Sequence, residues 1–259
     1  MSGQTILERD GAIARVRFDN PAMHNALTHQ MWVDLHDICV ELAADTTIRV
    51  VTFRGTGGKA FISGTDISSF ADFSSGADGV AYENEIDIFM RSIDKIPATT
   101  IAIVEGWAVG GGINISSACD FRIATPASKF GSPIGRTIGN CLSSSSYARV
   151  GGAVGVQIAK RMVLLGEMIT AQELLASGFL YRMVEPEELD AAVEALVQRA
   201  AENAPLTTRT TKEAIRRMTF DALPDIQDLI ATVYGSNDFR RGVHDFLAKT
   251  KKTPIWTGD

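Results

Sequence analysis

The chain has 259 residues, of which 45% are hydrophobic and 22% charged, a composition typical of a folded protein with a large core. Its net charge of −6 and pI near 5.3 argue against nucleic-acid binding as the main function, because nucleic-acid-binding surfaces are basic. Three widely separated cysteines provide no disulfide framework, which is typical of a reducing compartment. No segment has the roughly 18 consecutive apolar residues of a membrane span. We therefore expect a cytoplasmic protein without membrane or nucleic-acid partners.

Strands and helices are predicted in alternation along the first half of the chain. Residues 5–21 predict two strands joined by a turn at Asp10 and Gly11, and the helix that follows has Thr28 as its predicted N-cap. Apolar patterns then predict, in chain order, a buried strand at 48–55, a helix at 80–96 and two buried strands at 99–106 and 120–125.

Turns of small residues follow the predicted strands, with the sequences FISGTD, WAVGGG and SKFGSP. Strand, tight turn and helix in this order predict an α/β fold built as a coiled stack of ββα units. After about Glu187 the pattern is entirely helical. We therefore expect a core over residues 1–190 and a helical region over 191–259 that docks on the core or on a neighbouring subunit.

Several well-known site motifs are excluded by the residues present. The segment GTGGKA has Phe53 and Ala60 where a phosphate-binding P-loop needs glycine and a hydroxyl residue, and the dinucleotide pattern GxGxxG fails at Ile115. There is no GxSxG or HExxH motif, and the four histidines form no metal-ligand cluster, so we expect no metal site.

Three consecutive glycines, Gly110 to Gly112, lie between a predicted strand and a predicted helix. Amide N–H groups at such a position are unpaired and lie at the positive end of the helix dipole, where they can stabilise an anion or a polarised carbonyl oxygen. A second turn of this kind spans residues 63–66. If the turns face each other they form a two-donor oxyanion hole, whereas each turn alone can equally be a helix start or a close packing contact.

Five segments in a fixed order resemble the crotonase (enoyl-CoA hydratase/isomerase) superfamily: NPAMHNAL, KAFISGTDI, GWAVGGGINISSACDFRIA, FGSPIG and DFRRGVHDFLAK. The resemblance implies a spiral of ββα units with a C-terminal helical trimerisation region, in a homotrimer or a dimer of trimers. It also implies an acyl-CoA substrate whose thioester oxygen lies between the amides of Thr65 and Gly111. No permanently bound cofactor is implied, since coenzyme A is part of the substrate.

The same resemblance implies a set of coenzyme A contacts. They are Ala22, Met23, His24, Lys59, Ser63, Gly64, Asp66, Ile67, Gly110, and, reaching a neighbouring subunit's coenzyme A, Phe246 and Lys249. Ala22 replaces a basic residue that is frequent in the family at this position. Surface solvation is the alternative explanation for the two lysines, and an ordinary loop histidine is the alternative for His24.

The sequence departs from the family where hydratases carry two glutamates, since Asn114 and Ile134 stand at those positions. Neither side chain can act as a general base, so hydration by two glutamates is not expected. Arg136 can bind a substrate carboxylate, or bridge a trimer or cap a helix.

Other residues offer a replacement for the missing acid–base groups. Glu83, Glu85 and Asp87 lie on the predicted helix 80–96, where one can supply a base, although a solvated charged face is the simpler interpretation. Cys141 can be a nucleophile, but a buried structural thiol is favoured because no histidine lies near it in sequence.

Two classes of function follow from these observations. The first is an enzyme that acts on an acyl-CoA thioester through a stabilised enolate, by decarboxylation, isomerisation or thioester hydrolysis with a different base. The second is a non-catalytic acyl-CoA-binding subunit that has lost its acid–base residues.

Overall fold

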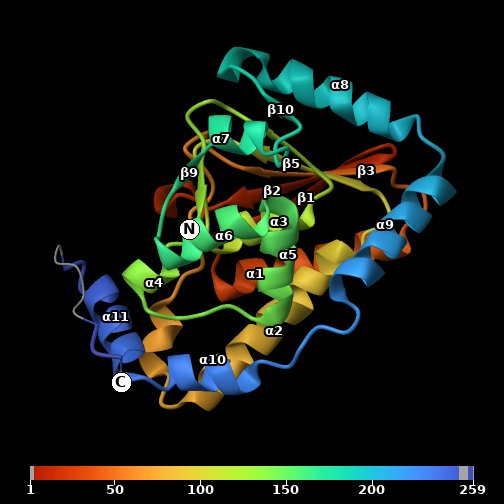
Figure 1. The fold of residues 1–259 in the computed structure, drawn as a ribbon. Helices are drawn as coiled ribbons and strands as arrows, with labels where there is room; N and C mark the ends of the chain where they lie inside the picture. Colours follow the sequence, from red (N-terminus) through yellow and green to blue (C-terminus); the bar gives the residue numbers. More distant parts are fainter. Residues whose placement is uncertain (1–2, 251–255, 259) are drawn as a thin grey trace.

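The computed structural model describes residues 3–250 and 256–258, which form two β-sheets surrounded by helices (Figure 1). The strands are β1 (Gln4–Asp10), β2 (Ile13–Asp19), β3 (Val50–Gly55), β4 (Ala60–Ile62), β5 (Thr99–Val104), β6 (Trp107–Val109), β7 (Phe121–Ala124), β8 (Lys129–Gly131), β9 (Ile169–Thr170) and β10 (Arg182–Met183). Over the described residues, one sheet has the order β1-β2-β3-β5-β7-β10 and the other the order β4-β6-β8-β9.

Helices connect and cover these strands. They are α1 (His29–Ala44), α2 (Gly76–Asp94), α3 (Gly111–Ala118), α4 (Ile134–Thr137), α5 (Ser144–Val154), α6 (Val156–Leu164), α7 (Ala171–Ala176), α8 (Leu189–Ala201), α9 (Pro205–Phe220), α10 (Gln227–Tyr234) and α11 (Asn237–Leu247), with short 3-10 turns η1 (Pro21–Met23), η2 (Ser68–Asp72) and η3 (Pro186–Glu188). In Figure 1, α8 lies on one side of the strands, and α1 and α2 lie on the other.

The middle of the chain repeats one structural unit. In β3-β4-α2, β5-β6-α3 and β7-β8-α4, the first strand joins the larger sheet and the second joins the smaller sheet. Successive units pair in parallel, β3 with β5 and β5 with β7 in one sheet, and β4 with β6 and β6 with β8 in the other. The predicted coiled stack of ββα units is therefore the observed fold.

Local sequence signals explain where the first helices begin. The Thr28 side chain accepts a hydrogen bond from the amide of Met31, so this predicted N-cap is confirmed. Helix α2 begins at Gly76, four residues before the predicted start, because Ser75 and Asp78 form a capping box.

The C-terminal helices pack closely on the core. Leu189 and Leu196 of α8 are buried against Ile101 of the larger sheet. The predicted division between residues 190 and 191 therefore falls inside a helix that packs on the sheet, and the two-part organisation stays a prediction. Residues 251–255 and 259 of the proposed helical region lie outside the described residues.

Glycines allow the last two helices to approach their neighbours. A Cβ atom at Gly79 of α2 would overlap the ring of Tyr234 in α10, and one at Gly242 of α11 would overlap the backbone of Ile138. Larger residues would push these helices away from the core. In the part of the chain that the structure describes, no helix is long and apolar enough to cross a membrane.

Candidate active site

Two glycine-containing turns meet at one edge of the smaller sheet. The turn at residues 63–66 follows β4 and the Gly110 turn follows β6, and these two strands are parallel neighbours. A Cβ atom built on Gly110 would lie 3.7 Å from the Cα atom of Gly64, and one built on Gly111 would lie 3.3 Å from Oγ1 of Thr65. The fold thus brings together two turns that are more than 40 residues apart in the sequence.

Among the described residues, the N–H groups of Thr65 and Gly111 have no hydrogen-bond acceptor, and neither do those of Gly64 and Gly112 beside them. The amide after Thr65 and the amide before Gly111 are paired, since Asp66 N–H donates to the carbonyl of Leu27 and Gly110 N–H donates to the carbonyl of Gly131. Gly111 is the first residue of α3, so its N–H lies at the positive end of the helix. The amides of Thr65 and Gly111 can therefore both donate to a ligand.

A different structural feature accounts for glycine at each position of the triplet. Gly110 has φ of 54°, a conformation that favours glycine, and Gly64 in the other turn has φ of 140°. At Gly112 a Cβ atom would overlap the carbonyl oxygen of Ile62, so close packing explains this residue. At Gly111 a Cβ atom would lie 3.1 Å from the Trp32 ring, a tight but less severe contact. Packing alone therefore explains Gly112 better than it explains Gly111.

Aromatic side chains hold Thr65 in place. The indole Nε1 of Trp32 donates to Oγ1 of Thr65 over 3.3 Å. Burial raises the pKa of Tyr82, and the nearby Thr65 side chain opposes this rise. Trp32 in turn stacks on Phe89 of α2, with ring centroids 6.0 Å apart. Helices α1 and α2 therefore both support the turn.

The predicted coenzyme A loop lies against the same turn. Ser63 N–H donates to the carbonyl of His24 and Ser63 Oγ donates to the carbonyl of Met23, each over 3.2 Å. Ala22, Met23 and His24 are all exposed. The structure thus joins residues 22–24 to the Thr65 turn, and their contact with coenzyme A stays a prediction.

The remaining predicted contact residues lie at several places around the turns. Lys59 and Asp66 are exposed, whereas Ile67 is buried against the α11 residues Phe239 and Val243. Phe246 and Lys249 are exposed at the end of α11, where the amide of Lys249 donates to the carbonyl of Phe246. Their contact with a neighbouring subunit's coenzyme A stays a prediction.

Arg136 is exposed on α4, and its side chain lies over Gly166, where a Cβ atom would overlap it. This contact places the arginine beside the loop between α6 and β9. The predicted binding of a substrate carboxylate by Arg136 stays a prediction.

Asn114, where the resemblance implies the first glutamate, belongs to a buried polar network. Its Nδ2 donates to Oγ of Ser146 over 2.9 Å, and its Oδ1 accepts from Arg149 over 3.3 Å. Arg149 forms an ion pair with Asp94 at 2.5 Å, and the two side chains are 2% and 7% exposed. The amide is thus held in one orientation, and a carboxamide cannot act as a general base.

Ile134 and Cys141 provide no acid–base group either. Ile134, where the resemblance implies the second glutamate, is the buried first residue of α4. Burial raises the pKa of the Cys141 thiol to about 12, so the thiolate is scarce at neutral pH. The interpretation of Cys141 as a structural thiol is therefore favoured.

Glu83 is buried, and the prediction of a solvated acidic face is wrong for this residue. Only 2% of it is exposed, whereas 44% of the Glu85 side chain is exposed beside His29. Glu83 Oε1 accepts from the Tyr234 hydroxyl over 2.7 Å, and Oε2 accepts from the amide of Ser143 over 2.8 Å. Burial raises the pKa of its carboxyl to about 7.

The spacing along α2 could have revealed this burial. Gly79, Glu83, Ile86, Met90 and Ile93 recur at helical intervals of three and four residues, and all of them are buried. Glu83 therefore occupies a position in the apolar stripe, where a charged residue is unusual.

A pH-dependent stability follows from the raised pKa of Glu83. Between the ordinary value of 4.5 and about 7, the folded protein keeps a proton that the unfolded chain releases, so stability falls as pH rises. Over roughly 2.5 pH units this amounts to ~3 kcal/mol. Urea unfolding at pH 5 and pH 8 should show that Glu83→Gln gains about this much relative to wild type at the higher pH. A stability difference that is the same at both pH values would contradict the raised pKa.

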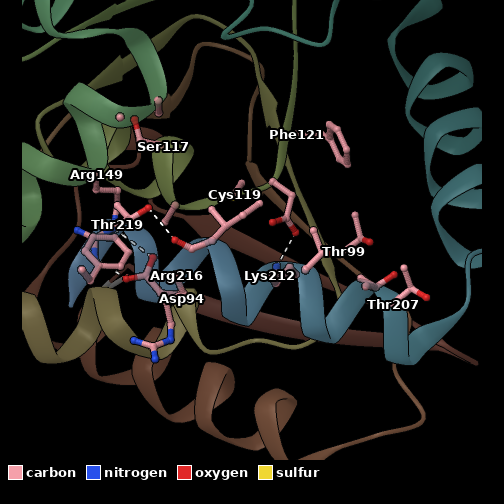
Figure 2. Close-up of a pocket in the computed structure, with 18 of the residues that line it drawn as sticks. Asp94, Thr99, Ser117, Cys119, Phe121, Arg149, Thr207, Lys212, Arg216 and Thr219 are labelled. Carbon is pink, nitrogen blue, oxygen red and sulfur yellow. Dashed lines mark hydrogen bonds and ion pairs between the residues drawn. The ribbon is translucent and has the colours of Figure 1, made fainter.

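A separate cavity of about 790 Å³ lies between α9 and the far end of α3. Figure 2 shows Asp94 and Arg149 at one end of it and Lys212 of α9, which pairs with Asp120 at 2.5 Å, further along. Its lining includes Ser117 to Phe121, so it meets α3 at its C-terminal end, whereas Gly111 is at the N-terminal end. The cavity is therefore not the space in front of the two turns.

The sequence matches the family described as enoyl-CoA hydratase/isomerase over residues 8–258. The chain belongs to this family. It is 29% identical to the short-chain-enoyl-CoA hydratase of Clostridium acetobutylicum over 251 residues, 95% of each chain. It is also 29% identical to the methylmalonyl-CoA decarboxylase of Escherichia coli over 247 residues, 92% of this chain and 93% of that one.

A solved structure of methylmalonyl-CoA decarboxylase in complex with 2-nitronate-propionyl-CoA superimposes with a TM-score of 0.89, at 27% identity and over 99% of both chains. The predicted crotonase fold and superfamily are thus confirmed, as is the prediction of an enzyme of the enoyl-CoA hydratase/isomerase family with its exact reaction left open. The trimeric state of this crotonase stays a prediction.

Proposed function

We propose that this crotonase converts an acyl-CoA thioester through an enolate whose oxygen is bound by the amides of Thr65 and Gly111. The observation that supports this most directly is that the N–H groups of Thr65 and Gly111, in two adjoining turns, have no acceptor among the described residues. Two such donors, one of them at a helix start, stabilise negative charge that develops on a thioester oxygen. The loop at residues 22–24, hydrogen-bonded to Ser63, then holds the coenzyme A portion.

Hydration of a double bond by two glutamates is disfavoured by the residues at the site. Asn114 is held by Ser146 and Arg149, and Ile134 is apolar and buried. A general acid or base commonly contributes about 10²–10⁴-fold to a rate, and neither residue can supply that contribution.

Decarboxylation is the second candidate, because it forms an enolate without a base. The bond between the α-carbon and the carboxylate breaks, its electron pair enters the enolate, carbon dioxide leaves, and one proton then adds to the α-carbon. The similarity to methylmalonyl-CoA decarboxylase in sequence and in structure favours this reaction.

We also propose a homotrimer or a dimer of trimers, and exposed apolar residues on α9, including Leu206, Ile215 and Met218, are consistent with such an assembly.

The proposed function predicts that the enzyme exchanges α-protons of acyl-CoA thioesters with deuterium oxide, or converts them. Saturated, α,β-unsaturated and malonyl-type thioesters should be incubated with the protein and followed by mass spectrometry, with each thioester alone as the control. Deuterium uptake, or loss of carbon dioxide from the malonyl-type thioester, is the expected result. Binding without exchange or conversion across the set would instead favour a non-catalytic acyl-CoA-binding subunit.

A further inference from the structure

We infer that Glu83 transfers the proton at the α-carbon of the thioester, in place of the glutamates absent at positions 114 and 134. This inference rests on the proposed enolate chemistry. The acid–base group of the reaction would then lie on α2, and not at the α3 and α4 positions where the resemblance implies glutamates.

The position of Glu83 links it to the Thr65 turn. It directly follows Tyr82, whose pKa is raised by burial and lowered by the nearby Thr65 side chain. Trp32, which donates a hydrogen bond to Thr65, stacks on Phe89 of the same helix. The middle of α2 therefore lies along the turn that carries the Thr65 amide.

Hydrogen bonds also link Glu83 to the position of the first missing glutamate. Its carboxylate accepts from the amide of Ser143, and the hydroxyl of Ser143 accepts from the amide of Ser146 over 3.1 Å. Ser146 Oγ accepts from Asn114. Glu83 and Asn114 thus bind the two ends of the same short segment at the start of α5.

Other acidic residues of α2 and of the Thr65 turn are less suited to this role. Asp94 is paired with Arg149, Asp66 is exposed, and Glu85 is half-exposed beside His29. Asp87 accepts from the Ser143 hydroxyl over 2.6 Å and is only half-buried. Glu83 is the residue of this group that is buried without a cationic partner, because none of the salt bridges of the described residues includes it.

The surroundings of Glu83 favour a carboxyl that can both take and give a proton. The titratable groups around it are Tyr82 and Asp87 from its own helix, Tyr234 from α10, Cys141 from the loop before α5 and Tyr147 from α5. Burial and the charge of Asp87 raise the pKa of Glu83 to about 7, whereas the hydrogen bonds from Tyr234 and Ser143 oppose the rise. Proton transfer by a side chain is most efficient when its pKa lies near the working pH.

Both carboxylate oxygens of Glu83 keep a lone pair that can accept a proton. Each accepts one hydrogen bond in the structure, from Tyr234 or from Ser143, and a carboxylate oxygen has two lone pairs. In the exchange step, Glu83 takes the proton from the α-carbon as the C–H electron pair enters the enolate. The reverse step returns a proton, or a deuteron after exchange with solvent, to the same carbon.

The test measures α-proton exchange from pH 5 to pH 9 for wild type, Glu83→Gln, Tyr234→Phe and the control Glu85→Gln. We expect the wild-type rate to rise with pH through about 7, since the base form is required. Glu83→Gln should lose at least about 100-fold and should lose this pH dependence. Tyr234→Phe keeps the carboxylate but removes a hydrogen bond that stabilises it, so the rise should move to higher pH. Glu85→Gln should behave as wild type.

The outcomes separate this inference from the proposed function. If the wild type exchanges α-protons and Glu83→Gln has the same rate and pH profile, the role of Glu83 is overturned and the proposed function is not. Wild type that neither exchanges nor converts any thioester would overturn the proposed function and this inference with it. If Glu83 served only to hold α10, Tyr234→Phe would lower stability without moving the pH profile, which would also overturn the inference. Thermal unfolding of each variant checks that it is folded.

Discussion

Gly111→Val is expected to lower turnover of an acyl-CoA thioester by about 10²–10³-fold, the effect of losing one oxyanion donor. A Cβ atom at this position would already lie 3.1 Å from the Trp32 ring and 3.3 Å from Oγ1 of Thr65. The two further methyl groups of valine therefore crowd the space between the turns and separate the two amides. Steady-state kinetics with the thioester that wild type converts best measures the loss.

Two other glycines, one beside Gly111 and one on α5, provide the controls for this substitution. Gly112→Val should lower stability as well as activity, because its Cβ atom would overlap the carbonyl oxygen of Ile62. Gly152→Ala on α5 meets open space and should preserve both properties. Full turnover by a folded Gly111→Val enzyme would exclude the proposed role of this amide.

Arg149→Met should lower the free energy of unfolding by about 3–5 kcal/mol, because it leaves the buried carboxylate of Asp94 without its partner. The substitution also removes the hydrogen bond that Arg149 donates to Oδ1 of Asn114. Methionine keeps much of the side-chain length, so the lost charge accounts for most of the effect. Urea unfolding monitored by circular dichroism measures the change.

The matched control is Arg161→Met, on the surface. Arg161 pairs with Glu167 and Glu173, but 41% of its side chain is exposed, and exposed pairs contribute about 0–1 kcal/mol. The double variant Asp94→Leu/Arg149→Met should recover part of the stability lost by Arg149→Met, since no unpaired buried charge remains. Equal losses for Arg149→Met and Arg161→Met would contradict the importance of this buried pair.

Much of the local structure followed from short-range patterns in the sequence. The first two strands, the Thr28 cap and the three buried strands lie where periodicity and turn residues predicted them. These signals depend on neighbouring residues, so they can be recognised without a structure. The repeated order of strand, glycine turn and helix likewise predicted the ββα spiral, and the segments around Thr65 and Gly111 identified the family.

The partners of individual polar side chains depended on the tertiary fold. Glu83 meets Tyr234, 151 residues away, and Asn114 meets Arg149, 35 residues away. A side chain's burial and pKa are set by the residues packed around it, and no local pattern specifies which distant helix supplies them. The sequence therefore has Asn114 and Ile134 where the family resemblance implies glutamates, whereas the folded arrangement of α2, α5 and α10 showed that Glu83 is buried, and we propose this carboxyl as their replacement.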